Sequence, residues 1–179
     1  FLNSGNFYRA ITYKHLQLAR NPEDQVQILQ TAKEINLSVV DGFVHVDNVN
    51  VESLLHNDDI DRYVAAHSAI VGVRHIVNEH LRRLAANGLH VVGEGRDLTT
   101  EVFPNADCKI FLDANAKVRA NRRYLQQSSA MTLEQLEKSI EERDQIDRTK
   151  PVGALRIADD AQYIDSSYLT IDEVYEKVL

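Results

Sequence analysis

The stretch Gly93–Asp97, which reads Gly-Glu-Gly-Arg-Asp, constrains the fold of this chain more than any other feature. The apolar run Leu89–Val92 precedes it, and a second apolar run, Cys108–Leu112, follows Val102-Phe103-Pro104. This order indicates a strand, a charged glycine-rich loop and another strand. Ligands bind at the carboxyl edge of open α/β sheets, where such a loop lies, and glycine permits the tight backbone path. The alternative is a surface turn with an incidental Arg-Asp pair.

Apolar segments of strand length alternate with helical segments along the rest of the chain. Asn21-Pro22 is a helix start signal, and Thr132–Gln135 and Thr170–Glu173 are capping boxes that open two later helices. Gly88 is expected to cap a helix, and Ser128–Ala130 to end another. The alternation predicts an α/β fold with a parallel sheet covered by helices on both faces. The helices are expected at about 6–20, 22–35, 64–87 (bent near Ser68), 116–127, 132–147 and 170–179, and a short strand at 161–165.

One segment departs from this alternation. The apolar runs Leu37–Val40 and Phe43–Val46 flank Asp41-Gly42, which is a strong hairpin signal. Val49–Val51 is expected to add a third strand. We therefore predict a small antiparallel sheet inserted between helices of the main domain.

Composition limits the function. The 179 residues suffice for one well-buried domain, and the net charge of −7 argues against non-specific nucleic-acid binding as the main role. No apolar run approaches the roughly 20 residues that cross a bilayer. The only cysteine, Cys108, is expected to be a small buried residue of a core strand, and a single cysteine fits a reducing cytoplasm. Three histidines on the 64–87 region (His67, His75 and His80) lack metal-ligand spacing and are expected to be packing or surface residues.

Arginines gather in predicted loops and helix starts, although the protein is acidic. Arg119, Arg122 and Arg123 share one helix face and repel one another unless an anion joins them; a solvated basic face is the alternative. Arg143 and Asp147 lie four residues apart on one helix face, a spacing at which they could form a simple helix ion pair. Arginine binds phosphate bidentately, and phosphoryl transfer requires positioning and charge neutralisation rather than a protein nucleophile. The pattern therefore favours small phosphorylated ligands. The set is Arg9, Arg74, Arg96, Arg119, Arg122, Arg123 and Arg143.

The chain also resembles the bacterial cytidylate (CMP) kinases of the nucleoside monophosphate kinase group. Asn3–Arg9 is similar to that family's DSGxxYR, and Gly95–Ala106 is similar to its GRDxGTxVFPxA. Lys109–Leu112 and Arg119–Arg123 resemble its KIFL and RAxRR, and Glu142–Arg148 and Asp159–Asp165 resemble its C-terminal part. The resemblance covers essentially the whole chain.

This resemblance implies a P-loop NTPase-type α/β fold and transfer of the γ-phosphoryl group of ATP, with Mg²⁺, to CMP or dCMP. It also implies three parts of the chain. Residues 1–35, 68–118 and 151–179 form the core, 36–67 the inserted monophosphate-binding subdomain, and 119–150 the lid. A monomer without nucleic-acid or membrane partners is expected.

The resemblance further implies a role for each matching residue. Ser4, Tyr8 and Arg9 line the monophosphate site, and Arg74 contacts the base. Arg96 lies near phosphate, Asp97 near the cytosine edge, and Arg143, Asp147 and Lys150 around the phosphate and ribose of the acceptor. Arg119, Arg122 and Arg123 face ATP from the lid, and Glu94 holds Mg²⁺ through water. The residues expected to act in catalysis are Arg96, Arg122, Arg143 and Asp147.

The sequence departs from the family pattern at several positions. Ala65 replaces a usual serine, His56 and Lys150 replace arginines, and Glu94 replaces an aspartate of many members. The phosphate-binding motif G-x-x-x-x-G-K-S/T does not occur in residues 1–179. We expect it in a segment of roughly 20 to 25 residues upstream of Phe1, on the usual strand-loop-helix geometry, and expect the chain as given to be inactive as a kinase.

Two alternatives stay open. The first is a non-catalytic nucleotide-binding relative that lacks a donor P-loop. The second is a kinase that acts on UMP or AMP. Asp97 can accept a hydrogen bond from the cytosine amino group but not from a uracil carbonyl, which favours cytosine.

Overall fold

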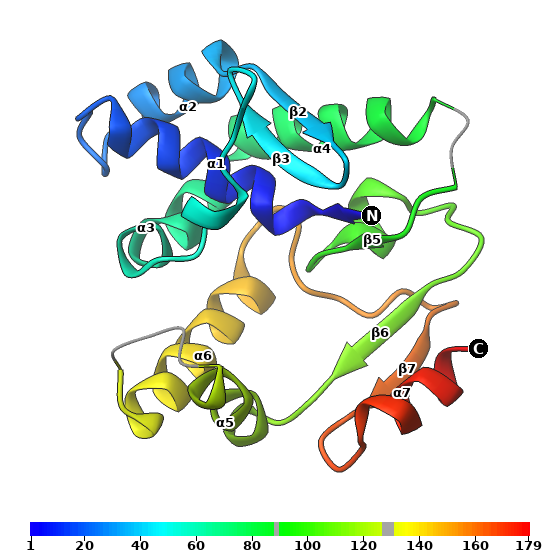
Figure 1. The fold of residues 1–179 in the computed structure, drawn as a ribbon. Coiled ribbons are helices and arrows are strands. Elements are labelled where there is room, and N and C mark those ends of the chain that lie inside the picture. The colour runs from blue at the N-terminus through cyan, green and yellow to red at the C-terminus, as the bar shows by residue number, and fades with distance from the viewer. Residues whose placement is uncertain (88–89, 127–130) are drawn as a thin grey trace. The chain divides into compact units, whose positions relative to one another are not determined.

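The computed structural model describes residues 1–87, 90–126 and 131–179 (Figure 1). The chain forms two compact units, Phe1–Gly95 and Arg96–Leu179. Each unit has its own helices and its own pair of parallel strands. The expected helix cap at Gly88 and the helix end at Ser128–Ala130 lie outside the described residues.

Helices dominate the first unit. They are α1 (Ser4–Gln17), α2 (Gln25–Glu34), α3 (Asp58–Ala69) and α4 (Val71–Ala85), and a short 3₁₀ turn spans Glu52–Leu54. Helix α1 contacts the other three helices, so its apolar face supplies the centre of the core. Side chains from all four helices are almost fully buried in this unit, among them Phe7, Ile11, Ile28, Ile60, Val73 and Leu81.

The predicted hairpin insert is confirmed. Strands β2 (Leu37–Val40) and β3 (Phe43–Val46) pair antiparallel with Leu37 opposite Val46 (Figure 1). Strand β4 (Val49–Asn50) pairs with β3 and continues the sheet. Asp41 and Gly42 have φ angles of 52° and 84°, as the two central residues of a tight hairpin turn require.

The first parallel pair joins β1 (Leu2–Asn3) to β5 (Gly93–Glu94), with Leu2 opposite Gly93. The expected strand at Leu89–Val92 is therefore displaced: the paired residues are the first two of the glycine-rich stretch. Leu89 lies outside the described residues, and Val92 is exposed although its carbonyl accepts the Leu2 N–H at 2.8 Å.

The second unit contains the second parallel pair. Strand β6 (Ile110–Asp113) pairs with β7 (Gln162–Asp165), and the helices are α5 (Ala116–Leu125), α6 (Leu133–Thr149) and α7 (Ile171–Val178) (Figure 1). Both predicted capping boxes are confirmed, at Thr132 and Thr170. Parallel strand pairs, flanking helices and the antiparallel insert confirm the α/β fold class.

Two helix predictions were wrong. Asp24, not Asn21, caps α2, because its carboxylate accepts the N–H groups of Val26 and Gln27. The region expected as one helix bent near Ser68 is divided into two helices, since Ile70 has an extended backbone with ψ of 117° between α3 and α4.

The prediction that Cys108 is buried in a core strand was also wrong. Cys108 is exposed, and β6 begins two residues later at Ile110. The buried neighbour is Lys109, whose Nζ binds both carboxylate oxygens of Asp160 at 2.8 and 2.7 Å. None of the helices in the described part of the chain is long and apolar enough to span a membrane.

Candidate active site

The first unit holds the candidate acceptor residues of α1. Ser4 and Tyr8 are buried on this helix. Arg9 donates from Nη1 to the carbonyl of Leu55 at 2.9 Å and from Nη2 to Asp61 Oδ1 at 2.6 Å. Arg9 thus ties α1 to the start of α3, and its charge is balanced by a half-buried carboxylate.

Arg74 lies on α4 and is only 2% exposed. Its guanidinium carbon is 5.5 Å from the centroid of the Tyr8 ring, and its Nη1 donates to the carbonyl of Ser68 at 3.0 Å. An aromatic face stabilises a desolvated cation. The structure therefore brings together Tyr8 and Arg74, two residues that were both expected to contact the acceptor nucleotide.

Glu94, the candidate for Mg²⁺, is the last residue of β5 and is exposed. One of its carboxylate oxygens accepts a hydrogen bond from Asn3 Nδ2. Among the described residues, no group of three or more His, Cys, Asp or Glu side chains is placed to hold a metal. A single carboxylate fits Mg²⁺, which keeps several waters and is held largely by substrate phosphates.

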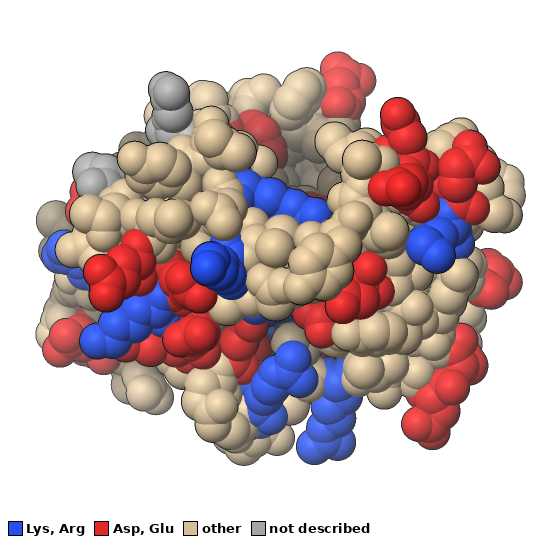
Figure 2. Space-filling model, turned by 90° about the horizontal axis from the view of Figure 1, so that it is seen from below, with Lys and Arg blue, Asp and Glu red and all other residues tan. Residues whose placement is uncertain are grey.

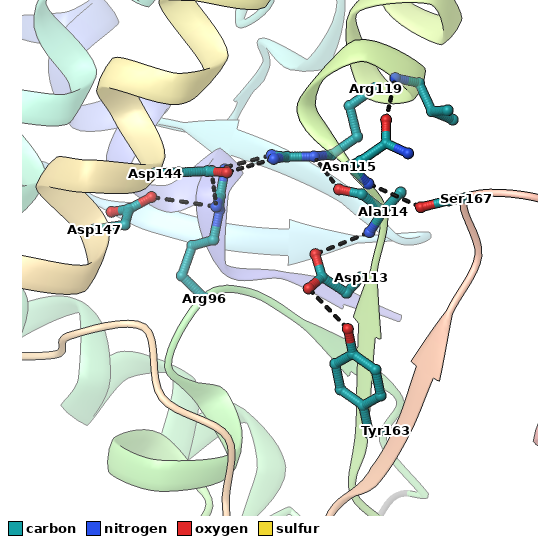
Figure 3. Close-up of polar contacts among 10 residues, drawn as sticks. Arg96, Asp113, Ala114, Asn115, Arg119, Asp144, Asp147, Tyr163 and Ser167 are labelled. Atoms are coloured by element: carbon teal, nitrogen blue, oxygen red, sulfur yellow. Dashed lines mark hydrogen bonds and ion pairs between the residues drawn. The ribbon is translucent and has the colours of Figure 1, made fainter.

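Asp144 on α6 is the centre of the polar network in the second unit (Figure 3). Its Oδ1 accepts from Arg96 Nη1 at 3.2 Å and from Arg119 Nη1 at 3.0 Å, and its Oδ2 accepts from Arg119 Nη2. Burial alone would raise the pKa of Asp144, but the hydrogen bonds and charges of Arg119 and Arg96 outweigh it and lower that pKa. The carboxylate is therefore ionised and shared by two guanidinium groups.

Asp147, one turn further along α6, extends the network to a third cation. Its Oδ1 accepts from Lys150 Nζ at 2.9 Å, and its Oδ2 lies 3.4 Å from Arg96 Nη1. That Oδ2 is buried and lacks a hydrogen-bond partner in the described part of the chain. Positive and negative side chains alternate along the series Lys150, Asp147, Arg96, Asp144 and Arg119, which we call the alternating charge network. Its three cations and two carboxylates give it a formal charge of +1.

The remaining candidates of the second unit lie on α5, on α6 and in the turn that follows Arg96. Arg122 on α5 donates to Ser166 Oγ at 3.1 Å and to the Ser166 carbonyl at 2.7 Å, in the segment after β7. Arg123 and Arg143 are half-buried on α5 and α6. Asp97 is 4% exposed, and its carbonyl accepts the Glu101 N–H at 2.8 Å at the start of a π-helical turn, Leu98–Val102.

Two carboxylates that the sequence did not single out hold candidate residues in place, and a third joins the insert to α1. Asp144 binds Arg96 and Arg119, and Asp61 binds Arg9. Glu52 joins the insert to α1, since it accepts from Val44 N at 3.0 Å and from Asn6 Nδ2. The only signal was for Asp144, which belongs to the Glu-Arg-Asp run that carried the resemblance.

Comparison with known proteins identifies the family of this chain. A family model described as cytidylate kinase matches residues 1–179. The cytidylate kinase of Borrelia hermsii is 40% identical over 185 residues, which cover 100% of this chain and 84% of the relative. Cytidylate kinase 1 of Borrelia garinii subsp. bavariensis and the cytidylate kinase of Borrelia turicatae are 40% and 41% identical, over 97% of this chain and 80% of each relative. This chain therefore belongs to the cytidylate kinase family.

Proposed function

We propose that this protein catalyses transfer of the γ-phosphoryl group of ATP to CMP or dCMP. An oxygen of the acceptor phosphate forms a bond to the γ-phosphorus, the bond from that phosphorus to the β,γ-bridging oxygen breaks, and the nucleoside diphosphate and ADP leave. The observation that carries the proposal is the family match, which spans every candidate residue of both units.

In the first unit, Ser4, Tyr8 and Arg9 contact the acceptor phosphate and Arg74 contacts the base. The support is their burial and fixed orientation: Arg9 is held by Leu55 and Asp61, and Arg74 lies over the Tyr8 ring. Side chains that are already ordered lose little entropy when a ligand binds.

In the second unit, Arg96 contacts phosphate and Asp97 accepts from the cytosine amino group. Arg143, Asp147 and Lys150 contact the phosphate and ribose. The buried Oδ2 of Asp147 supports the ribose contact, because a hydroxyl donor would satisfy an oxygen that has no hydrogen-bond partner among the described residues.

The donor side uses the arginines of α5 as part of a lid that spans 119–150, while 36–67 forms the monophosphate-binding insert and 1–35, 68–118 and 151–179 the core. Arg119, Arg122 and Arg123 face ATP, with Arg122 on its phosphates. Arg122 is exposed and bound to Ser166, so it can exchange that partner for phosphate. Lid closure would exclude water and suppress ATP hydrolysis.

Mg²⁺ fits the donor chemistry, and Glu94 would hold it through water. When bound, the ion neutralises negative charge on the phosphates. The chain's own contribution is orientation and positive charge at the transferred group, for which we assign Arg96, Arg122, Arg143 and Asp147 as catalytic residues.

The test is product formation by the protein expressed from its full coding sequence. With ATP and Mg²⁺, we expect chromatography to show CDP and ADP in equal amounts from CMP, and slower turnover of UMP and AMP. Absence of CDP would overturn the proposal. Calorimetry separates the alternatives, because a non-catalytic module would bind CMP but not ATP.

A further inference from the structure

We infer that Asp144 is a positioning residue of this site, which orients Arg96 and Arg119 for contact with phosphate and keeps both arginines paired while phosphate is bound. The inference rests on the proposed function, in which these two arginines meet the acceptor and the donor. The residues involved all belong to the second unit.

Arg119 is held at both ends of its guanidinium group. Nε donates to the carbonyl of Ala114 at 2.8 Å, and Nη1 and Nη2 both donate to the Asp144 carboxylate (Figure 3). A bidentate pair fixes the plane of the guanidinium as well as its position. Each Nη still carries one further N–H that points away from Asp144, so Arg119 can bind an anion without leaving its partner.

Arg96 is held at one end only. Its recorded contacts within the described residues are made by Nη1, at 3.2 Å to Asp144 Oδ1 and 3.4 Å to Asp147 Oδ2. The opposite edge, formed by Nε and Nη2, is the fork that binds phosphate bidentately. Its side chain is 38% exposed, against 18% for Asp144. Asp144 therefore anchors Arg96 by one nitrogen and leaves the fork available.

The charges explain why a carboxylate is needed here. Arg96 and Arg119 donate to the same Asp144 oxygen, so the two guanidinium groups approach each other closely. Without that oxygen they repel, and the half-exposed Arg96 is the one free to move away. With it, the alternating charge network keeps its formal charge of +1 and still attracts an anion.

A different role would leave the same ligand-free geometry. Asp144 could stand in for the ligand as a competing anion, and phosphate would then displace it. The two roles predict opposite signs for the effect of Asp144→Asn on anion affinity. A competitor's removal tightens binding, whereas removal of a positioning residue weakens it.

Calorimetry with inorganic tripolyphosphate, at one fixed ionic strength, measures that sign. Glu141→Gln is the matched control, because it removes the same charge from an exposed position of the same helix. We expect Asp144→Asn to weaken tripolyphosphate binding about fivefold or more, and Glu141→Gln to leave it within about twofold. Unchanged or tighter binding by Asp144→Asn overturns the inference.

Turnover of CMP supplies the second measurement. We expect Asp144→Asn to lower kcat about 10- to 100-fold, with KM for CMP changed less than about threefold, because misplaced donors cost most in the transition state. Asp144→Glu keeps the charge and should recover at least half of that loss on a logarithmic scale; no recovery, or a loss confined to KM, contradicts a positioning role.

The variants must first be shown to fold, by circular dichroism and thermal unfolding. If Asp144→Asn does not fold, Arg119→Lys replaces it, because lysine keeps the positive charge but loses the bidentate fork of arginine. We expect the same losses of tripolyphosphate affinity and of kcat from this variant. Normal binding and turnover would overturn the inference. If the unaltered protein makes no CDP, the proposed function fails, and the tripolyphosphate comparison still decides the role of Asp144.

Discussion

At the residue scale, Asp97 is the side chain on which the choice of base depends. It is 4% exposed at the start of the π-helical turn, and an ionised carboxylate can only accept hydrogen bonds. An asparagine amide in its place can also donate to the O4 carbonyl of uracil. We therefore expect Asp97→Asn to lower the preference for CMP over UMP, measured as the ratio of kcat/KM, by about tenfold or more.

Asp107→Asn is the control for this prediction, because Asp107 is an exposed carboxylate in the same unit and has no assigned role. Its selectivity should match that of the unaltered protein. Unchanged selectivity in Asp97→Asn would contradict a contact between Asp97 and the cytosine amino group, and UMP would again be a candidate acceptor.

His67 makes the stability of the first unit depend on pH. Its ring is buried, donates from Nε2 to the Pro22 carbonyl at 2.9 Å and lies 3.0 Å from Thr12 Oγ1 through Nδ1. Burial lowers the pKa of His67 below its ordinary value, although the Pro22 carbonyl opposes that shift, and the charge of His15 lowers it further. The native state therefore keeps this imidazole neutral while the unfolded state takes up a proton.

Because the unfolded state binds this proton more readily, the free energy of unfolding decreases as the pH falls. Above a pH of about 6.5 both states are neutral and His67 adds no pH dependence; below it, the free energy of unfolding falls by up to about 1.4 kcal/mol per pH unit until the lowered pKa is reached. Urea unfolding at pH 7.5 and 5.5 measures the loss. The exposed His75, changed to Gln, should leave the slope intact, whereas His67→Gln should reduce it to the part contributed by His80, whose pKa is also lowered by burial. An unchanged slope in His67→Gln would contradict the assignment.

The chemistry of single residues was more predictable than their partners. Spacing on α5 correctly indicated that Arg119 needs an anionic neighbour, since it binds Asp144. The partner lies on another helix, 25 positions away, so no local pattern could indicate it. Arg9 and Asp61 are a second case, 52 positions apart. Such pairs depend on how elements pack, and helical periodicity carries no information about that.

At the element scale, the hairpin turn of the insert isolates a single backbone effect. Gly42 has a φ of 84°, and nothing lies within 4 Å of the position that a β-carbon would occupy. An alanine side chain at this position meets no steric clash, so Gly42→Ala should lower the free energy of unfolding only through the left-handed backbone conformation, by about 1–2 kcal/mol. Urea unfolding measures it.

Gly42→Asn is the matched variant, because asparagine adopts this conformation more readily than alanine does. We expect it to recover part of the loss. Equal stability of the alanine variant and the unaltered protein would show that the turn relaxes to another geometry.

Elements with local signals were predicted well, and those that depend on packing were not. Asp41-Gly42 and the capping boxes at Thr132 and Thr170 lie within a few residues of the groups they satisfy. The bend expected near Ser68 is a full break at Ile70, because α3 ends there and α4 turns to pack against α2 and α3. Cys108 lies outside β6 because strand pairing begins at Ile110, and an apolar run does not show at which residue pairing starts.

At the scale of the whole molecule, charge separates a small phosphorylated ligand from a nucleic-acid polymer. The chain has 20 Lys and Arg residues against 27 Asp and Glu residues. Figure 2 shows acidic side chains intermingled with the basic ones on the face in view. The arginines with recorded ion pairs at the candidate site, Arg9, Arg96 and Arg119, are balanced by carboxylates. An acidic chain whose site arginines are paired with carboxylates is suited to one phosphate group rather than to a nucleic-acid polymer.

Salt dependence tests this difference. A polymer-binding protein releases many counterions, so its affinity falls steeply with salt, whereas a nucleoside monophosphate meets few cations. In calorimetry we expect CMP affinity to fall less than about tenfold between 50 and 200 mM salt. A 30-nucleotide RNA should bind more weakly than about 100 μM at the higher concentration, in a filter assay with the same protein. Tight RNA binding with a steep salt slope would contradict the assignment, because it would require a basic surface that the acidic composition opposes.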